Sequence, residues 1–160
     1  MRNAPTPHLE LVCSYTAALQ APEVIGPVPG GIRVNFYVTG GQLEGPGMKG
    51  HLRPVGGDWL TIRADGMAVL DVRATVEMDD GALIDVLYRG IGDLGLDGYE
   101  KFLRGELPQT LPLRTSPVLQ SADPKYQSLQ RELFVGVGAV DFATLVVAYD
   151  VYAVRCDGAQ

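Results

Sequence analysis

Short runs of alternating apolar and polar residues, separated by glycine and proline, recur along most of the chain. The clearest run is Met67–Met78, in which every second residue from Ala68 to Val76 is apolar, while Asp71 and Arg73 fall on the other face. Ile32–Thr39 alternates in the same way. A period of two is typical of a strand with one buried face. Both runs are therefore predicted to be β-strands.

Further strands are expected between the turn signals that follow these runs. Asp65-Gly66 is read as a two-residue hairpin turn, because both positions tolerate the positive φ that such a turn requires. Gly26–Gly31, rich in glycine and proline, is read as a connection. The remaining predicted strands are His8–Leu19, Met48–Pro54, Asp58–Ala64, Ala82–Gly90, Leu133–Gly138 and Thr144–Val154.

Three segments depart from this rhythm. Tyr99–Arg104 is expected to form one or two helical turns, and Lys125–Glu132 a short helix. Gln109–Ser121 contains Pro112 and Pro117. Proline cannot donate to a strand ladder, so this segment is predicted to be extended or irregular and not a central strand.

Eight to ten closely spaced strands with little helix predict an all-β fold, and 160 residues fit one domain spanning 1–160. No rhythm of strand, helix and strand is present. We expect a closed antiparallel barrel rather than an open sheet, because closure removes the unpaired edges of so many apolar strands.

Composition excludes several classes of partner and cofactor. The net charge is −6 and the 13 basic residues are scattered, which argues against a nucleic-acid partner. No apolar run approaches the ~20 residues of a membrane helix, and the N-terminus lacks a signal peptide, so a cytoplasmic protein is expected. Cys13 and Cys156 are read as free thiols. With two histidines and no nucleotide or metal motif, we expect no metal and no cofactor.

Charged and aromatic residues gather on both sides of the Asp65-Gly66 bend. The group consists of Asp58, Trp59, Arg63, Asp71 and Arg73. Asp71 and Arg73 are two residues apart and so share a strand face. If the group is buried, its carboxylates could have shifted pKa values and its arginines could hold a carbonyl or oxyanion. A solvated strand face carrying ion pairs is the alternative, and spacing cannot decide between them.

Two tyrosines and one acidic residue complete the candidate ligand-binding set. Tyr37 shares a strand face with Arg33 and Asn35, and Tyr88 follows the Asp80-Gly81 turn. Either phenol could donate a hydrogen bond to an oxyanion in a pocket. Glu44 begins the charged region and is included as a binding residue.

Seven short motifs in a fixed order make the chain similar to an uncharacterised family, domain of unknown function 3237 (uncharacterised protein family 0311). The resemblance runs from about residue 25 to residue 154. The motifs are Gly40-Gly41, Glu44-Gly45-Pro46, Gly56-Gly57-Asp58-Trp59, Arg63-Ala64-Asp65-Gly66, Asp71-Val72-Arg73, Asp80-Gly81-Ala82-Leu83-Ile84 and Tyr88-Arg89-Gly90.

This resemblance implies a barrel of the lipocalin or allene-oxide-cyclase type and favours cofactor-free chemistry on a small molecule. Our hypothesis is an acid/base enzyme, a cyclase, isomerase, hydratase or lyase, acting on a partly aromatic or polyketide-like substrate. Asp58 or Asp71 would be the acid/base group, Arg63 and Arg73 would stabilise the oxyanion, and Trp59 with Tyr37 or Tyr88 would shape the pocket.

The alternative is a barrel that binds a small molecule without catalysis, in which the charged group is structural. Association is a separate expectation. The run Thr144–Val154 is apolar on both faces, which suggests a homodimer or larger homo-oligomer.

Overall fold

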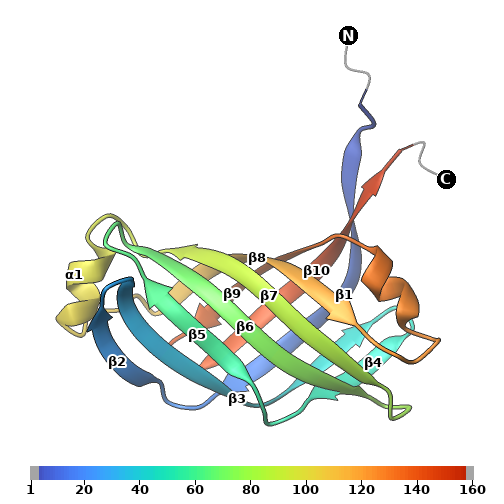
Figure 1. Ribbon diagram of the computed structural model, residues 1–160, viewed down its shortest axis with the longest axis horizontal. Coiled ribbons are helices and arrows are strands. Elements are labelled where there is room, and N and C mark those ends of the chain that lie inside the picture. The colour runs from blue at the N-terminus through green and yellow to red at the C-terminus, as the bar shows by residue number, and fades with distance from the viewer. Residues whose placement is uncertain (1–3, 158–160) are drawn as a thin grey trace.

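A computed structural model describes residues 4–157 and consists almost wholly of β-strands around one core (Figure 1). The helical elements within that range are α1 (Gly98–Leu103) and the 3-10 helix η1 (Gln127–Arg131). The strands are β1 (Pro7–Leu19), β2 (Glu23–Val28), β3 (Gly31–Gly45), β4 (Met48–Leu52), β5 (Gly57–Ile62), β6 (Met67–Met78), β7 (Leu83–Asp93), β8 (Thr110–Gln120), β9 (Phe134–Asp141) and β10 (Val146–Cys156).

The strands close into an antiparallel barrel. The sheet runs β1-β10-β9-β8-β7-β6-β4-β3, and pairing of β1 with β3 joins its two ends. β4 and β5 both lie between β3 and β6, end to end, and so share one of the eight positions around the ring. The predicted closed all-β barrel is confirmed.

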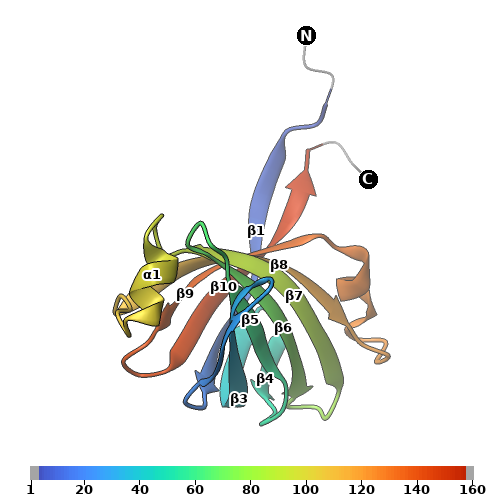
Figure 2. The same ribbon diagram turned by 60° about the vertical axis from the view of Figure 1, so that its left-hand side comes forward.

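Two features lie outside the ring. β2 pairs only with β3 and forms an outer strand. The first part of β1 pairs only with the end of β10, from Pro7 with Cys156 to Leu11 with Tyr152. Figures 1 and 2 show this pair as a two-stranded ribbon that projects from the barrel and carries both chain ends.

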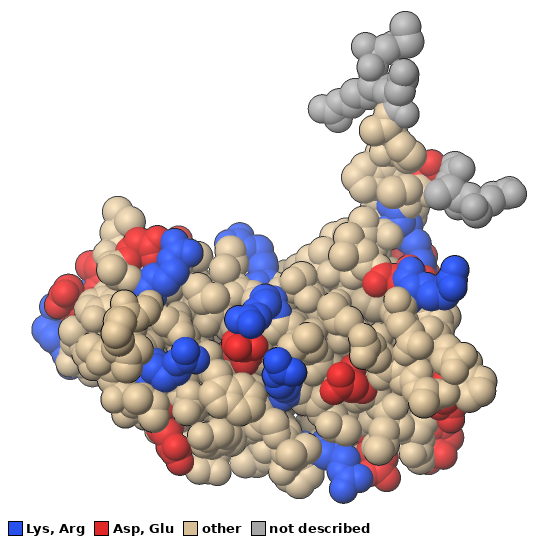
Figure 3. Space-filling view, in the orientation of Figure 1, with Lys and Arg blue, Asp and Glu red and all other residues tan. Residues whose placement is uncertain are grey.

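Alternation along each strand divides the residues between the lumen and the outer surface. In β6, Ala68 to Val76 alternate as buried residues, while Asp71 and Arg73 face outward. Acidic and basic side chains are interspersed on the face in Figure 3. Within residues 4–157 no helix is long and apolar enough to cross a membrane.

The segment Gln109–Ser121 is a paired inner strand of the sheet, so the prediction that it is not a central strand was wrong. β8 pairs with β7 from Arg114 to Gln120 and with β9 from Thr110 to Thr115. Pro112 has no partner on β7, and Pro117 has none on β9. Each proline therefore has one unpaired side, where a missing N–H costs no ladder hydrogen bond.

Other boundaries differ less. Part of the predicted connection Gly26–Gly31 belongs to β2, which forms a hairpin with β3. The expected helix at Lys125–Glu132 is the shorter η1, and the turns expected at Tyr99–Arg104 correspond to α1.

The end of the barrel next to η1 is filled by packed side chains. Phe134 begins β9 and is 1% exposed, and Leu129 of η1 is also buried. The Tyr126 hydroxyl donates a hydrogen bond to Asp80 over 2.8 Å, which fixes the start of η1 to the β6–β7 turn. Phe134 and Leu129 do not line the open cavity of the lumen.

Candidate active site

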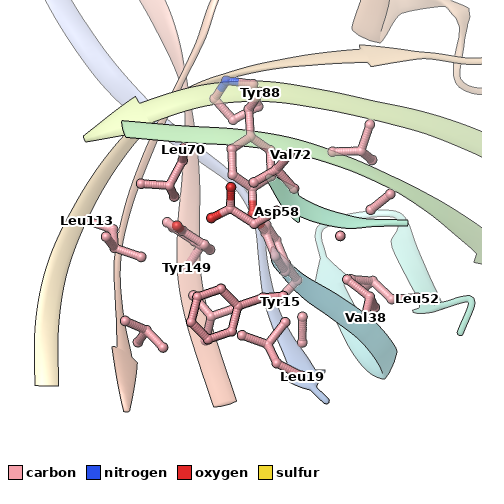
Figure 4. A pocket seen from close by; sticks show the side chains of 18 of the residues that line it. Tyr15, Leu19, Val38, Leu52, Asp58, Leu70, Val72, Tyr88, Leu113 and Tyr149 are labelled. Carbon is pink, nitrogen blue, oxygen red and sulfur yellow. The ribbon is translucent and has the colours of Figure 1, made fainter. Parts of the chain in front are cut away.

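The lumen contains a narrow cavity whose wall is almost entirely apolar. The part of it that is open to the centre of a water molecule has a volume of about 70 Å³. Among the lining residues the polar side chains, apart from the Cys13 thiol, are those of Tyr15, Asp58, Tyr88 and Tyr149 (Figure 4).

Asp58 reaches the lumen at a gap in the ladder between β5 and β6. Asp58 pairs with Val72, but the next ladder pair is Thr61 with Val69. Within this gap the backbone N–H of Asp71 donates to the Asp58 carboxylate over 2.9 Å. The Arg33 guanidinium donates to the carbonyl oxygen of Trp59 over 3.0 Å. Side chains thus satisfy two backbone groups, and the carboxyl group of Asp58 is fixed at the cavity wall.

The pKa of Asp58 is raised from 3.8 to about 7. Burial in the apolar lumen is the largest cause, because it disfavours the charged carboxylate. The hydrogen bond from the Asp71 N–H lowers the pKa, the negative charge of Asp71 raises it and the charge of Arg33 lowers it. A carboxyl group with a pKa near neutrality can both release and accept a proton at physiological pH.

Two phenols lie beside this carboxyl group, and a third, Tyr15, lies next to them. Figure 4 shows Asp58 pointing into the pocket toward the hydroxyl ends of Tyr88 and Tyr149. The ring of Tyr149 lies 5.2 Å from that of Tyr15 and 5.8 Å from that of Tyr88, measured between centroids. Burial raises the pKa of all three tyrosines, so each phenol is a neutral hydrogen-bond donor at neutral pH.

Tyr149 is held in place by a glycine on the neighbouring strand. Tyr149 is the register partner of Gly138, and a Cβ at position 138 would lie 2.5 Å from its ring. The ring therefore occupies space that any other residue at 138 would fill. The Tyr149 hydroxyl is buried and has no hydrogen-bond partner among residues 4–157.

The structure places two of the eight predicted site residues, Asp58 and Tyr88, in the lumen. Asp71 and Arg73 lie on the outer face of β6, where Asp71 pairs with Arg89 over 3.4 Å. Trp59 also faces outward and does not line the cavity. The expectation that the charged group looks inward as a unit is therefore not met.

The other three predicted residues are also outside the lumen. Arg63 follows β5 and forms an exposed ion pair with Asp65. Tyr37 lies on the outer face of β3 and its hydroxyl donates to Glu23 over 3.3 Å. Glu44 is exposed near the end of β3. None of these side chains can contact a molecule in the cavity from its present position.

A one-residue difference in register explains why Asp58 and Asp71 are on opposite faces. A two-residue turn at Asp65-Gly66 would pair position 58 with 73 and place Asp58, Asp71 and Arg73 on one face. Instead, the N–H of Arg63 donates to Met67, which makes a three-residue loop ending in Gly66 at φ +84°. With this longer loop, Asp58 pairs with Val72. Because a shift of one residue exchanges the two faces of a strand, Asp58 shares the inner face with Val72, while Asp71 and Arg73 lie on the outer face.

Sequence reasoning missed Tyr15 and Tyr149. Both lie in strands that were recognised, and both continue an alternation of lumen-facing residues, Cys13-Tyr15-Ala17 in β1 and Val147-Tyr149-Val151 in β10. That alternation was the available signal. Across residues 4–157, no three His, Cys, Asp or Glu side chains come together in a way that could hold a metal ion.

The fold and the cavity define this chain as a closed antiparallel β-barrel with one titratable carboxyl group in an apolar lumen. Comparison with known sequences then identifies the family. The chain belongs to the family described as "Protein of unknown function (DUF3237)", which matches residues 7–154.

Relatives and solved structures agree with this assignment. The UPF0311 protein of Rhodopseudomonas palustris is 32% identical over 137 residues, which cover 84% of this chain and 90% of the relative. Its crystal structure, described as a conserved protein of unknown function, has a TM-score of 0.82 with 30% identity, covering 94% of this chain and 99% of that one.

Two further structures show how widely the fold extends. A β-barrel-like protein from Acinetobacter baumannii has a TM-score of 0.80 and 26% identity, with 97% of this chain and 100% of that chain covered. A structure described as an enzyme from Penicillium herquei has a TM-score of 0.67 and 18% identity, with 97% and 98% covered. At that identity the second likeness concerns the fold alone.

Proposed function

We propose that this protein is a cofactor-independent acid/base enzyme that binds a small, partly aromatic or polyketide-like molecule in its lumen and moves a proton with Asp58. The observation that carries the proposal is the position of Asp58, a carboxyl group with a pKa of about 7 at the wall of an apolar cavity. Such environments are characteristic of catalytic acids and bases.

The side chains around the cavity suggest a division of roles. The Asp58 carboxylate accepts a proton from a carbon or hydroxyl group of the bound molecule and, once protonated, returns it to another atom of the same molecule. Tyr149 donates a hydrogen bond to the substrate oxygen on which negative charge develops. Tyr15 and Tyr88 shape the wall beside it. Isomerisation needs only this proton movement, whereas cyclisation, hydration and lyase cleavage combine it with a bond formed or broken within the substrate or with water, and none of the four consumes an oxidant or reductant.

We expect the wild-type protein to catalyse exchange of the methyl protons of acetophenone with deuterium in D₂O near neutral pH. This exchange requires a base beside the α-carbon and a donor beside the carbonyl oxygen, the arrangement proposed for Asp58 and Tyr149. The replacement Asp58→Asn should reduce the catalysed rate by about a hundredfold or more, because an amide is not a base. Proton NMR follows the loss of the methyl signal directly.

The matched control is Asp85→Asn, which removes an exposed carboxylate from the outer face of β7 and should leave the exchange rate unchanged. Binding of acetophenone without catalysed exchange would contradict the enzyme proposal and favour the non-catalytic binding protein. Equal rates in the wild type and Asp58→Asn would remove Asp58 from the mechanism.

A further inference from the structure

The charge of the lumen restricts what it can bind. The residues that line the cavity include no lysine, arginine or histidine, and Asp58 is the one carboxylic acid among them. The Cys13 thiol is also neutral near pH 7, because burial and then the charge of Asp150 raise its pKa to about 11. Bases such as Arg73 and Arg89 are on the outer surface.

An anionic ligand would therefore lose its hydration without gaining a partner charge. Transfer of a carboxylate or phosphate into such a cavity is strongly unfavourable unless a cation compensates it. Above its pKa, Asp58 would repel the anion as well. Sugar phosphates, acyl carriers with their phosphates and free carboxylic acids are poor matches for this lumen.

The tyrosine hydroxyls that line the lumen can donate hydrogen bonds to an acceptor on a ligand. Tyr149 is only 3% exposed, and its hydroxyl makes no hydrogen bond of normal geometry among residues 4–157, although the Tyr88 phenol lies close enough to influence its pKa. Buried polar groups are almost always satisfied in native proteins, so an unsatisfied one at a cavity wall indicates a missing partner. Below its pKa, Asp58 is a donor too, and Figure 4 shows it directed at the same part of the pocket.

The volume of the cavity adds a limit on the size of the ligand. About 70 Å³ of the lumen is open to the centre of a water molecule. At about 10–15 Å³ for each water centre, this corresponds to a few water molecules. A small molecule therefore fits this lumen better than a bulky one.

From these three observations we infer that the natural ligand is a neutral, small and mainly apolar molecule whose oxygen acceptor, such as a ketone or enone carbonyl, is bound by the Tyr149 hydroxyl beside Asp58. This inference narrows the substrate class and rests on the lumen being the binding site of the proposed function. It does not depend on whether Asp58 then moves a proton.

Four probes of nearly equal size separate the possible chemistries. They are acetophenone, a neutral ketone; α-methylstyrene, which has the same shape without the oxygen; benzoate, an anion; and benzylammonium, a cation. NMR titration of the intact protein at pH 6 should give the highest affinity for acetophenone, at least several-fold lower affinity for α-methylstyrene and no detectable binding of benzoate. Benzylammonium should also bind more weakly than acetophenone.

The variant Tyr149→Phe tests the predicted hydrogen bond. It should lower the affinity for acetophenone up to about tenfold and leave that for α-methylstyrene unchanged, because one neutral hydrogen bond contributes about that much. Tyr37→Phe, which removes a phenol from the outer face, should change neither affinity.

Tighter binding of benzoate or benzylammonium than of acetophenone would overturn the inference. The same holds if Tyr149→Phe binds acetophenone as tightly as the wild type does, or if none of the four probes binds. These results are distinguishable from failure of the proposed function. If acetophenone binds with the expected selectivity but undergoes no catalysed exchange, the inferred ligand class is supported and the proposed catalytic function is contradicted.

Discussion

Asp58→Asn should make the protein more stable than the wild type at pH 8, by a margin that develops between about pH 4 and pH 7. The folded protein raises the pKa of Asp58 from 3.8 to about 7, chiefly through burial. Below pH 4 the carboxyl is protonated in both states and does not disfavour folding. As the pH rises the unfolded chain releases this proton first, so stability falls until the folded pKa is passed.

The size of the effect follows from the shift. A change of roughly 3 pKa units corresponds to about 4 kcal/mol, and water reaching the carboxyl through the cavity makes this an upper value. Asparagine keeps the shape and can still accept the hydrogen bond from the Asp71 N–H, but it does not ionise. The difference in unfolding free energy between variant and wild type should therefore grow by up to about 4 kcal/mol from pH 4 to pH 8.

Urea unfolding at pH 4, 5, 6, 7 and 8 measures this difference. Asp85→Asn, on the outer face, serves as the control and should parallel the wild type throughout. If the curves of Asp58→Asn and the wild type also ran parallel, the carboxyl would be as well hydrated in the folded protein as in the unfolded chain.

Phe134→Ala should destabilise the protein by about 3–5 kcal/mol, the usual range for removing a fully buried aromatic ring. Phe134 is 1% exposed and fills the end of the barrel beside η1, away from the residues that line the open cavity. The loss should appear as a lower urea midpoint with an unchanged slope.

The neighbouring Leu133→Ala provides the comparison, because Leu133 is 67% exposed and should cost no more than about 0.5 kcal/mol. We also expect folded Phe134→Ala to bind acetophenone like the wild type. A large fall in affinity would mean that the filled end and the cavity are not separate, and a small loss of stability would mean that the end is not tightly packed.

Much of the fold could be predicted from the sequence because each barrel strand has one apolar face toward the lumen and one solvated face outside. Met67–Met78 was bounded correctly, since its alternation is strict and both ends carry turn residues. β8 was missed because its two prolines were taken as evidence against a central strand, before it was known which parts of β8 pair with β7 and which with β9. Whether Pro112 and Pro117 break a ladder depends on where β7 and β9 end, and that is a property of the whole sheet.

The candidate site was harder to predict for the same kind of reason. The sequence indicated Asp58 as a candidate site residue, but whether its side chain faces the lumen or the solvent depended on the length of the loop between β5 and β6, which is one residue longer than expected. Tyr15 and Tyr149 are 134 positions apart in the sequence, and only the pairing of β1 with β10 brings their side chains together. Local patterns give the faces of single strands, whereas a lumen is formed by strands from the whole chain.

The central claim is that the Asp58 carboxyl group lies inside the lumen in an apolar environment. The most direct measurement is a pH titration of its side-chain carboxyl carbon by ¹³C NMR, with the signal assigned by its absence from Asp58→Asn. We predict a midpoint close to pH 7. A midpoint near pH 4, like that of an exposed aspartate, would contradict the claim.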